Sequence, residues 1–373
     1  MKPMFGTPVS GGEFFDRKTL LNELKRNIHH AHHALIGPRG CGKSSVLEQL
    51  AAMEQVNNLV PLRIDINKVV PKTQRNVIKT IGKEALYAAV REKGFIRSMP
   101  TLAKDKMAKM TDFVRDNLRV KISDWVTLYF DPDADLTEFI ENTFSTIESY
   151  GIGLLVMLDE VTSIIRISGS KPKDEDMDFF DALRSHISKA KNANYIFCGS
   201  QVGLMELLIK AKFGRMLVPK EVGGLEEDGA RELVFSKIKQ RVPTEFMAEL
   251  KERTHLWPLY LQAYCLAANV RGGKLDTPAD LEADAFGFLR GHFLYLESMV
   301  SELELMVLLT LGDGRVSGIA SRLGTSYYAV QSALKTLDLK GFVKKLSPGT
   351  YAPLDPMFSA WLKREYESPE AWK

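Results

Sequence analysis

The chain has 373 residues, 45% of them hydrophobic and 26% charged, with a formal net charge of +3 at pH 7. These values are typical of a soluble globular protein with two or three domains. No apolar run approaches the roughly 20 residues that a membrane span needs. The three cysteines, Cys41, Cys198 and Cys265, are far apart and show neither metal-ligand nor disulfide spacing. We therefore expect a cytoplasmic protein that has no membrane partner.

The first predicted elements are a helix over residues 18–27 and a strand over residues 34–36. Between them stand four histidines: His29, His30, His32 and His33. Histidine clusters invite a metal interpretation, but this one abuts the strand and has no cysteine or carboxylate set nearby. We therefore expect these side chains to be structural or to face solvent.

The strand leads into Gly-Pro-Arg-Gly-Cys-Gly-Lys-Ser, which matches the phosphate-binding pattern G-x-x-x-x-G-K-[ST] without a mismatch. A helix-like stretch over residues 45–50 follows, so the order is strand, glycine loop and helix. The glycines allow a tight turn that points backbone N–H groups at phosphate oxygens. Lys43 is predicted to reach the β- and γ-phosphates, and Ser44 to ligate Mg²⁺. The predicted ATP contacts in this stretch are Gly37, Pro38, Arg39, Gly40, Cys41, Gly42, Lys43, Ser44 and Ser45.

A basic segment follows the second predicted strand, which covers residues 59–66. Residues 72–121 contain 13 Lys and Arg but only 5 Asp and Glu, a net of +8 that leaves −5 for the rest of the chain. Helices are predicted over 73–92 and 101–118, and the second, which is amphipathic, is interpreted as an insertion. Two interpretations stay open: a contact surface for nucleic acid or an acidic partner, and a solvated helix face.

After a predicted helix at 135–149, a continuous apolar run over residues 152–158 ends on Asp159 and Glu160. Such a run predicts a strand that is buried on both faces. Its carboxyl end places the two acids at the edge of the sheet where ligands bind. Asp159 is predicted to hold Mg²⁺, and Glu160 to polarise the attacking water as a general base.

Further core elements are predicted as a helix at 174–191, a strand at 195–201 and a strand near 213–218. Ser200 and Gln201 end the fourth strand, and either is a candidate for sensing the γ-phosphate or positioning water, although an ordinary strand-end turn fits equally well. Residues 226–269 have a helical pattern, in which Pro258 stands at a favoured first-turn position.

Residues 301–366 combine three predicted helices, 302–311, 316–323 and 326–339, with two short strands around Ser347-Pro348-Gly349. This is the element order of a winged helix-turn-helix, which would bind DNA through its third helix and its wing. Residues 301–373, however, contain 9 basic and 8 acidic residues, and DNA affinity depends largely on neutralised phosphates. Nucleic-acid binding and protein docking therefore both remain open.

Taken together, these motifs resemble the archaeal-type ATPase family, which is close to the AAA+ and STAND nucleotide switches. The matching motifs are Phe15-Asp16-Arg17, the glycine loop at 37–44, Leu158-Asp159-Glu160, Gly199-Ser200, Phe213-Gly214-Arg215, Trp257-Pro258, Leu354-Asp355-Pro356-Met357-Phe358 and Trp361-Leu362. The resemblance implies that Arg215 lies near the γ-phosphate or a subunit interface and that Pro258 packs on the adenine. Asp16 and Leu20 depart from the family pattern, so no adenine contact is expected of Arg17.

We therefore predict an α/β protein with an AAA+-like P-loop core at 1–224, which has a parallel five-stranded sheet and the basic insertion at about 72–121. A helical lid is predicted at 225–297 and a winged helix-turn-helix at 298–373. The predicted function is a Mg²⁺-dependent ATPase whose nucleotide state controls homo-oligomeric assembly, with DNA as the partner. The alternative is a slow-turnover STAND-type switch whose winged helix docks a protein. The predicted catalytic residues are Glu160, Lys43, Arg215 and Ser200, and the predicted DNA contacts are Lys104, Lys106, Lys109, Arg115, Lys344 and Lys345.

Overall fold

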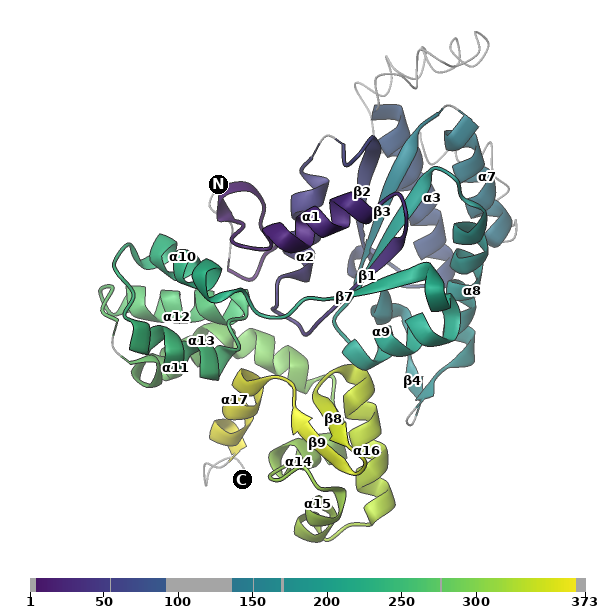
Figure 1. The fold of residues 1–373 in the computed structure, drawn as a ribbon. Helices are drawn as coiled ribbons and strands as arrows, with labels where there is room; N and C mark the ends of the chain where they lie inside the picture. The colour runs from purple at the N-terminus through teal and green to yellow at the C-terminus, as the bar shows by residue number, and fades with distance from the viewer. Residues whose placement is uncertain are drawn as a thin grey trace.

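The computed structural model describes residues 5–53, 55–91, 136–149, 151–168, 171–275 and 277–366. Its centre is a sheet of five parallel strands in the order β2-β3-β6-β1-β7 (Figure 1). The strands are β1 (His32–Ile36), β2 (Leu59–Asp65), β3 (Gly153–Asp159), β6 (Ala193–Gly199) and β7 (Leu217–Glu221). The predicted α/β class with a parallel five-stranded sheet is confirmed.

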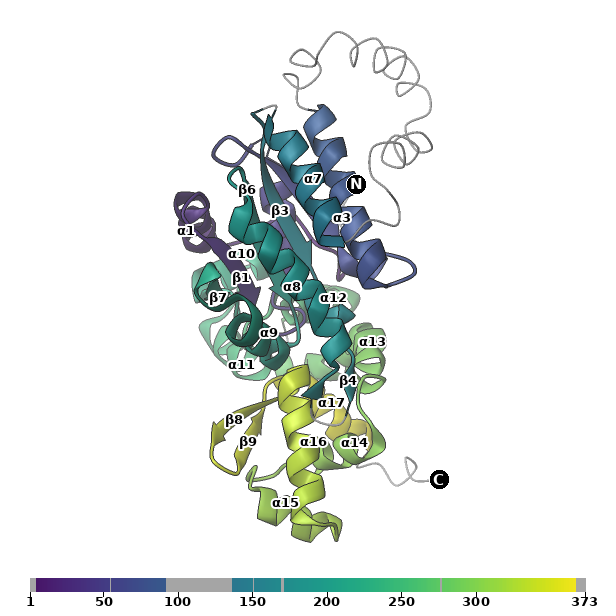
Figure 2. The same cartoon turned by 90° about the vertical axis from the view of Figure 1, so that its right-hand side faces the viewer.

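Helices cover both faces of this sheet, as alternation along β3 requires. Leu155 and Met157 join a core with α1 (Lys18–Asn27) and α2 (Lys43–Ala51). Leu154, Val156 and Leu158 point the other way. The helices on that second face are α3 (Gln74–Arg91), α7 (Leu136–Ser149), α8 (Asp174–Lys189) and α9 (Val202–Leu208) (Figure 2). Because successive strand residues face opposite sides, an apolar run such as β3 is needed to fill two cores.

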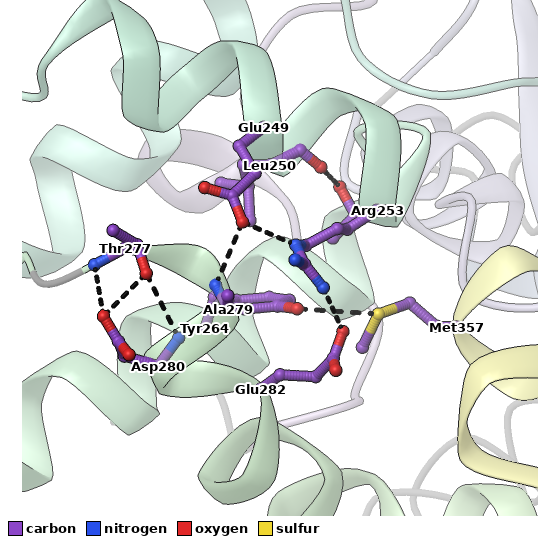
Figure 3. A network of polar contacts seen from close by, with 10 residues as sticks. Glu249, Leu250, Arg253, Tyr264, Thr277, Ala279, Asp280, Glu282 and Met357 are labelled. Carbon is purple, nitrogen blue, oxygen red and sulfur yellow. Dashed lines mark hydrogen bonds and ion pairs between the residues drawn. The ribbon is translucent and has the colours of Figure 1, made fainter. Parts of the chain in front are cut away.

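Four helices form a separate bundle beside the sheet: α10 (Glu227–Ile238), α11 (Thr244–Thr254), α12 (Pro258–Val270) and α13 (Pro278–Glu297) (Figure 1). Arg253 joins α11 to α13, because its guanidinium donates to Glu249 at 2.8 Å and to Glu282 at 2.7 Å (Figure 3). The helical pattern in the sequence was followed only to residue 269, so the helical lid predicted at 225–297 did not specify α13. Its signal was present, since Thr277 and Asp280 form a capping box with Pro278 in the first turn.

The C-terminal elements are α14 (Glu302–Leu309), α15 (Val316–Leu323), α16 (Tyr327–Lys340), the hairpin β8 (Val343–Ser347) and β9 (Thr350–Pro353), and α17 (Pro356–Tyr366). Three helices followed by a hairpin is the element order of a winged helix-turn-helix. The sequence showed motifs within α17 but did not predict a helix there. This helix attaches the C-terminal part to the helical bundle. The Tyr260 hydroxyl donates to buried Asp355, and the Tyr264 hydroxyl lies 3.9 Å from Met357 Sδ.

Several shorter elements were not expected from the sequence. A small hairpin pairs β4 (Ile167–Ser168) with β5 (Lys171–Pro172). Single turns lie at Gly11–Glu13, Ile66–Lys68, Val161–Ile164 and Gly214–Met216, and a π-helical turn lies at Ile209–Phe213. Residues 213–216, which were expected in the fifth strand, belong to the two turns before β7. The predicted helix at 101–118, with Lys104, Lys106, Lys109 and Arg115, lies outside the described residues.

The histidines around β1 make separate contacts. His29 Nε2 and the Asn57 carbonyl are 2.7 Å apart, and the Tyr195 backbone N–H donates to His32 Nδ1 at 3.1 Å. His33 is buried. Within the described ranges, no group of three or more His, Cys, Asp or Glu residues is placed to hold a metal ion. None of the described helices is both long and apolar enough to cross a membrane.

Candidate functional site

A cavity of about 280 Å³ lies at the carboxyl edge of the sheet. The N-terminal segment, the glycine loop, the ends of β2 and β3, and the helices α12 and α13 all contribute to its wall. Its lining residues include Thr7, Arg39, Gly40, Lys43, Ser44, Ser45, Arg63, Asp159, Glu160, Pro258, Gln262 and His292. Most of the predicted nucleotide and metal residues are therefore brought together in one place.

The glycine loop has the backbone shape that its composition predicts. Gly40 and Gly42 adopt φ angles of 82° and 96°, a region that residues with a Cβ rarely occupy. A Cβ at Gly37 would lie 2.1 Å from the carbonyl oxygen of Val222, so the residue that follows β7 leaves no space for a side chain there. These constraints hold the loop open at the start of α2, whose N-terminal N–H groups suit an anion.

Lys43 lies across the inside of this loop. Its ammonium donates to the carbonyl oxygens of Gly37 and Pro38, both at 2.7 Å. Burial opposes the charge, yet surrounding groups that include Glu160 and Asp159 raise the Lys43 pKa above its ordinary value. The side chain therefore stays cationic inside the cavity.

Asp159 ends β3 and is 2% exposed. Its Oδ2 accepts a hydrogen bond from Arg63 Nη2 at 2.7 Å. Its Oδ1 is buried and has no hydrogen-bond partner among the described residues. A buried carboxylate oxygen without a partner is costly, and here it lies in the same cavity as Ser44. The carboxylate and hydroxyl oxygens suit Mg²⁺, so the residues fit a divalent ion.

Glu160 follows directly and has a φ of 56°, which is uncommon for a residue other than glycine. Its Oε2 accepts a hydrogen bond from the Ser200 hydroxyl at 2.8 Å and lies 4.0 Å from Arg39 Nη2. Ser200 does not belong to the cavity lining itself, but it orients the carboxylate that does. The residue that follows β6 thus orients the carboxylate of the candidate base.

The helical bundle closes the cavity from the other side. The Leu259 N–H donates to the Gly40 carbonyl at 3.2 Å, which places Pro258 against the glycine loop. Arg39 stacks over the Tyr295 ring, with its guanidinium carbon 4.8 Å from the ring centroid. His292 also lines the cavity, and burial together with the Arg39 charge lowers its pKa to about 4. At neutral pH it is therefore uncharged.

Three side chains that line the cavity were missed by the sequence reasoning: Arg63, Gln262 and His292. Arg63 had a signal, because it is the only charged residue of β2 before Asp65 at the end of the strand. Gln262 and His292 had none that we recognise, since both lie on helices and reach the cavity only through the packing of the bundle.

Arg17 contacts the glycine loop from outside the cavity lining. Its Nη2 donates to the Cys41 carbonyl at 3.1 Å and also to the Gly223 carbonyl. It therefore connects the glycine loop to the segment that leaves β7. Cys41 itself is fully buried and does not line the cavity, although it was a predicted ATP contact.

The remaining predicted residues lie elsewhere. Arg215 is exposed in the turn before β7 and does not line the cavity. Lys344 and Lys345 are exposed on β8 of the C-terminal hairpin. These roles stay predictions, because a single chain contains neither a neighbouring subunit nor a nucleic acid.

No protein-family model and no curated protein matches the sequence. Among solved structures, the chain is similar to a Walker-type ATPase of Pyrococcus abyssi, with a TM-score of 0.67 and 19% identity over 96% of this chain and 98% of that one. This chain has the fold of an archaeal P-loop ATPase.

Two other solved structures are less similar. A STAND protein with a tetratricopeptide repeat sensor from Pyrococcus horikoshii gives a TM-score of 0.40 and 16% identity over 99% of this chain and 45% of that one. The ORC2 protein of Aeropyrum pernix gives a TM-score of 0.43 and 14% identity over 96% of this chain and 97% of that one. Both scores are too low to carry a conclusion.

Proposed function

We propose that the protein is a Mg²⁺-dependent ATPase whose nucleotide state controls homo-oligomeric assembly on DNA. The observation that carries this proposal is the convergence of the glycine loop, Asp159 and Glu160 on one cavity that the helical bundle closes. A core at 1–224, a lid at 225–297 and a winged helix at 298–373 would then be the three working units.

Each residue would have a separate task in hydrolysis. Lys43 would leave the loop carbonyls for the β- and γ-phosphates, while the backbone N–H groups of the glycine loop at residues 39–44 hold the remaining oxygens. Ser44 and Asp159 would hold Mg²⁺, which when bound neutralises phosphate charge. Glu160 would accept the proton of the attacking water, and the Ser200 hydroxyl keeps that carboxylate in place.

Assembly is supported by the position of Arg215. Its side chain is exposed and lies outside the cavity of its own chain, next to Gly214, whose φ of 53° and ψ of −123° suit only glycine. We infer that Arg215 acts on the ATP of a neighbouring subunit. In other P-loop proteins a cation supplied by a partner raises the rate by about 10³–10⁵.

DNA binding is supported by charge and exposure. The wing presents Lys344 and Lys345 to solvent, and Tyr328 at the start of α16 is 80% exposed. The basic segment at 72–121 carries the +8 that offsets an acidic remainder. We infer that Lys104, Lys106, Lys109 and Arg115 contact phosphates without reading bases.

A second candidate function, a slow-turnover switch, is favoured by one contact. The winged helix packs on the core through α16 and α9, where a Cβ at Gly203 would lie 2.5 Å from the Asp338 carbonyl oxygen. Gly341 approaches the backbone of Ser200 and Val202. Ser200 therefore lies between Glu160 and the winged helix, so a nucleotide-dependent shift of Ser200 would reach this contact.

The hydrolytic roles are tested by two substitutions. Lys43→Ala is expected to abolish ATP binding, because it removes the buried cation opposite the phosphates. Glu160→Gln is expected to retain ATP but lower turnover by at least about 10²-fold, since the base is lost while Asp159 remains. Filter binding and radiometric turnover measure the two effects. Wild-type turnover in Glu160→Gln would remove Glu160 from the mechanism.

The role of Arg215 is tested by mixing subunits. Arg215→Ala chains and Glu160→Gln chains are each expected to be inactive alone. If Arg215 acts in trans, some mixed interfaces combine an intact arginine with an intact base, so part of the turnover returns. Analytical ultracentrifugation of the mixture verifies co-assembly. Co-assembly without recovered turnover would assign Arg215 to its own chain.

The nucleic-acid proposal is tested by turnover with and without duplex DNA, and by fluorescence anisotropy over a salt series. DNA is expected to stimulate turnover. Changing Lys104, Lys106 and Lys109 to Ala is expected to flatten the slope of log K against log salt by up to about 2.7, because each phosphate contact contributes about 0.9. Lys344→Ala with Lys345→Ala should change it less. An unchanged slope in the triple variant, with a large loss in the wing variant, would move the DNA site to the wing.

The switch is tested with Gly203→Ala. Alanine favours an isolated helix by about 1 kcal/mol over glycine, but here its Cβ would collide with the α16 backbone. We expect faster amide exchange in α16 and α9 and a higher ATP turnover. Gly287→Ala in α13 is the matched control, because nothing lies within 4 Å of its Cβ position. Equal exchange in the two variants would exclude release of the winged helix.

A further inference from the structure

We propose that Arg63 is an internal counter-cation that competes with the divalent ion for Asp159 and so weakens metal retention. This inference rests on the proposed function and adds regulation to the same site. It would make the release of the metal and nucleotide easier than an unopposed carboxylate allows.

Arg63 is built into the sheet beside the predicted metal ligand. It lies on β2, which pairs with β3 so that Arg63 is opposite Met157 and Asp65 is opposite Asp159. From there its Nη2 reaches Asp159 Oδ2 at 2.7 Å. Both side chains are largely shielded from water, at 15% and 2% exposure, so solvent screens this ion pair weakly.

The pair leaves Asp159 divided between two tasks. One oxygen is held by Arg63, while the other is buried without a partner among the described residues and lies in the cavity with Ser44. A cation that binds this free oxygen meets a carboxylate whose charge is already balanced. Two positive groups on one carboxylate repel each other, most strongly where water is excluded.

Arg63 also has a second carboxylate partner, with which it can remain paired when it releases Asp159. Its Nη1 donates to Glu48 on α2, which is 41% exposed at the side chain. A neighbouring cavity of about 750 Å³ is lined by Arg63, Glu48 and Glu84. Arg63 can therefore release Asp159 and keep Glu48, which leaves no buried guanidinium without a partner. The balance between Asp159 and Glu48 sets how strongly Arg63 opposes the metal.

Because Arg63 is shared between Asp159 and Glu48, substitutions of Arg63 and of Glu48 are expected to have opposite effects on metal affinity. Arg63→Met removes the competing charge at similar length, so the metal should be held more tightly. Glu48→Gln weakens the second pairing, so Arg63 should stay on Asp159 and the metal should be held less tightly. Arg63→Lys keeps the positive charge and is the matched control. A residue with a merely structural role would not give a gain in affinity.

The experiment measures the affinity of a fluorescent ADP analogue in excess EDTA and in excess Mg²⁺, by anisotropy. The readout is the affinity in Mg²⁺ divided by the affinity in EDTA. This ratio does not depend on turnover. We expect this ratio to rise about tenfold in Arg63→Met, within the usual range for coupling between two bound ligands. It should fall in Glu48→Gln and stay near the wild-type value in Arg63→Lys.

An unchanged or lower ratio in Arg63→Met would overturn the proposal and make Arg63 an orienting residue for Asp159. An unchanged or higher ratio in Glu48→Gln would overturn it as well. If Arg63→Met does not fold, as judged by circular dichroism, Glu48→Gln and Arg63→Lys decide the question. If the wild-type chain binds no nucleotide under either condition, the proposed ATPase function itself fails, and this inference fails with it.

Discussion

The candidate site depends on one topological constraint, the position of β6 between β1 and β3. Parallel strands end at the same edge of a sheet, so the glycine loop after β1, the two acids after β3 and Ser200 after β6 meet there. The Ser200 to Glu160 hydrogen bond of 2.8 Å is the direct product of this order. If β1 and β3 were neighbours, Ser200 would not stand beside the acidic pair.

The helical bundle completes what the sheet begins. The first turn of α12 hydrogen-bonds the glycine loop at Gly40, and α13 brings Tyr295 over Arg39. Arg17 connects the same loop to the chain that leaves β7. The loop therefore contacts the bundle directly through its own backbone.

Charge within the site is arranged in opposed pairs. Arg63 faces Asp159, and Arg39 faces Glu160. Each acid that the proposed chemistry requires is thus compensated in the protein itself, which limits the cost of burying carboxylates. The C-terminal part, residues 301–366, touches this arrangement at its edge, through the close approach of Gly341 to the backbone of Ser200.

The sequence by itself determined the elements whose signals are local. The glycine loop, the apolar run that ends at Asp159 and Glu160, and the cap of α16 at Ser326 are each fixed by neighbouring residues. The contacts of Arg63 with Asp159 and of Ser200 with Glu160 join positions 96 and 40 residues apart. The packing of α16 on α9 and the reach of His292 into the cavity likewise join distant elements. Only the tertiary structure decided these contacts. Side-chain pairing across strands and helices depends on register and packing, which no short stretch of sequence specifies.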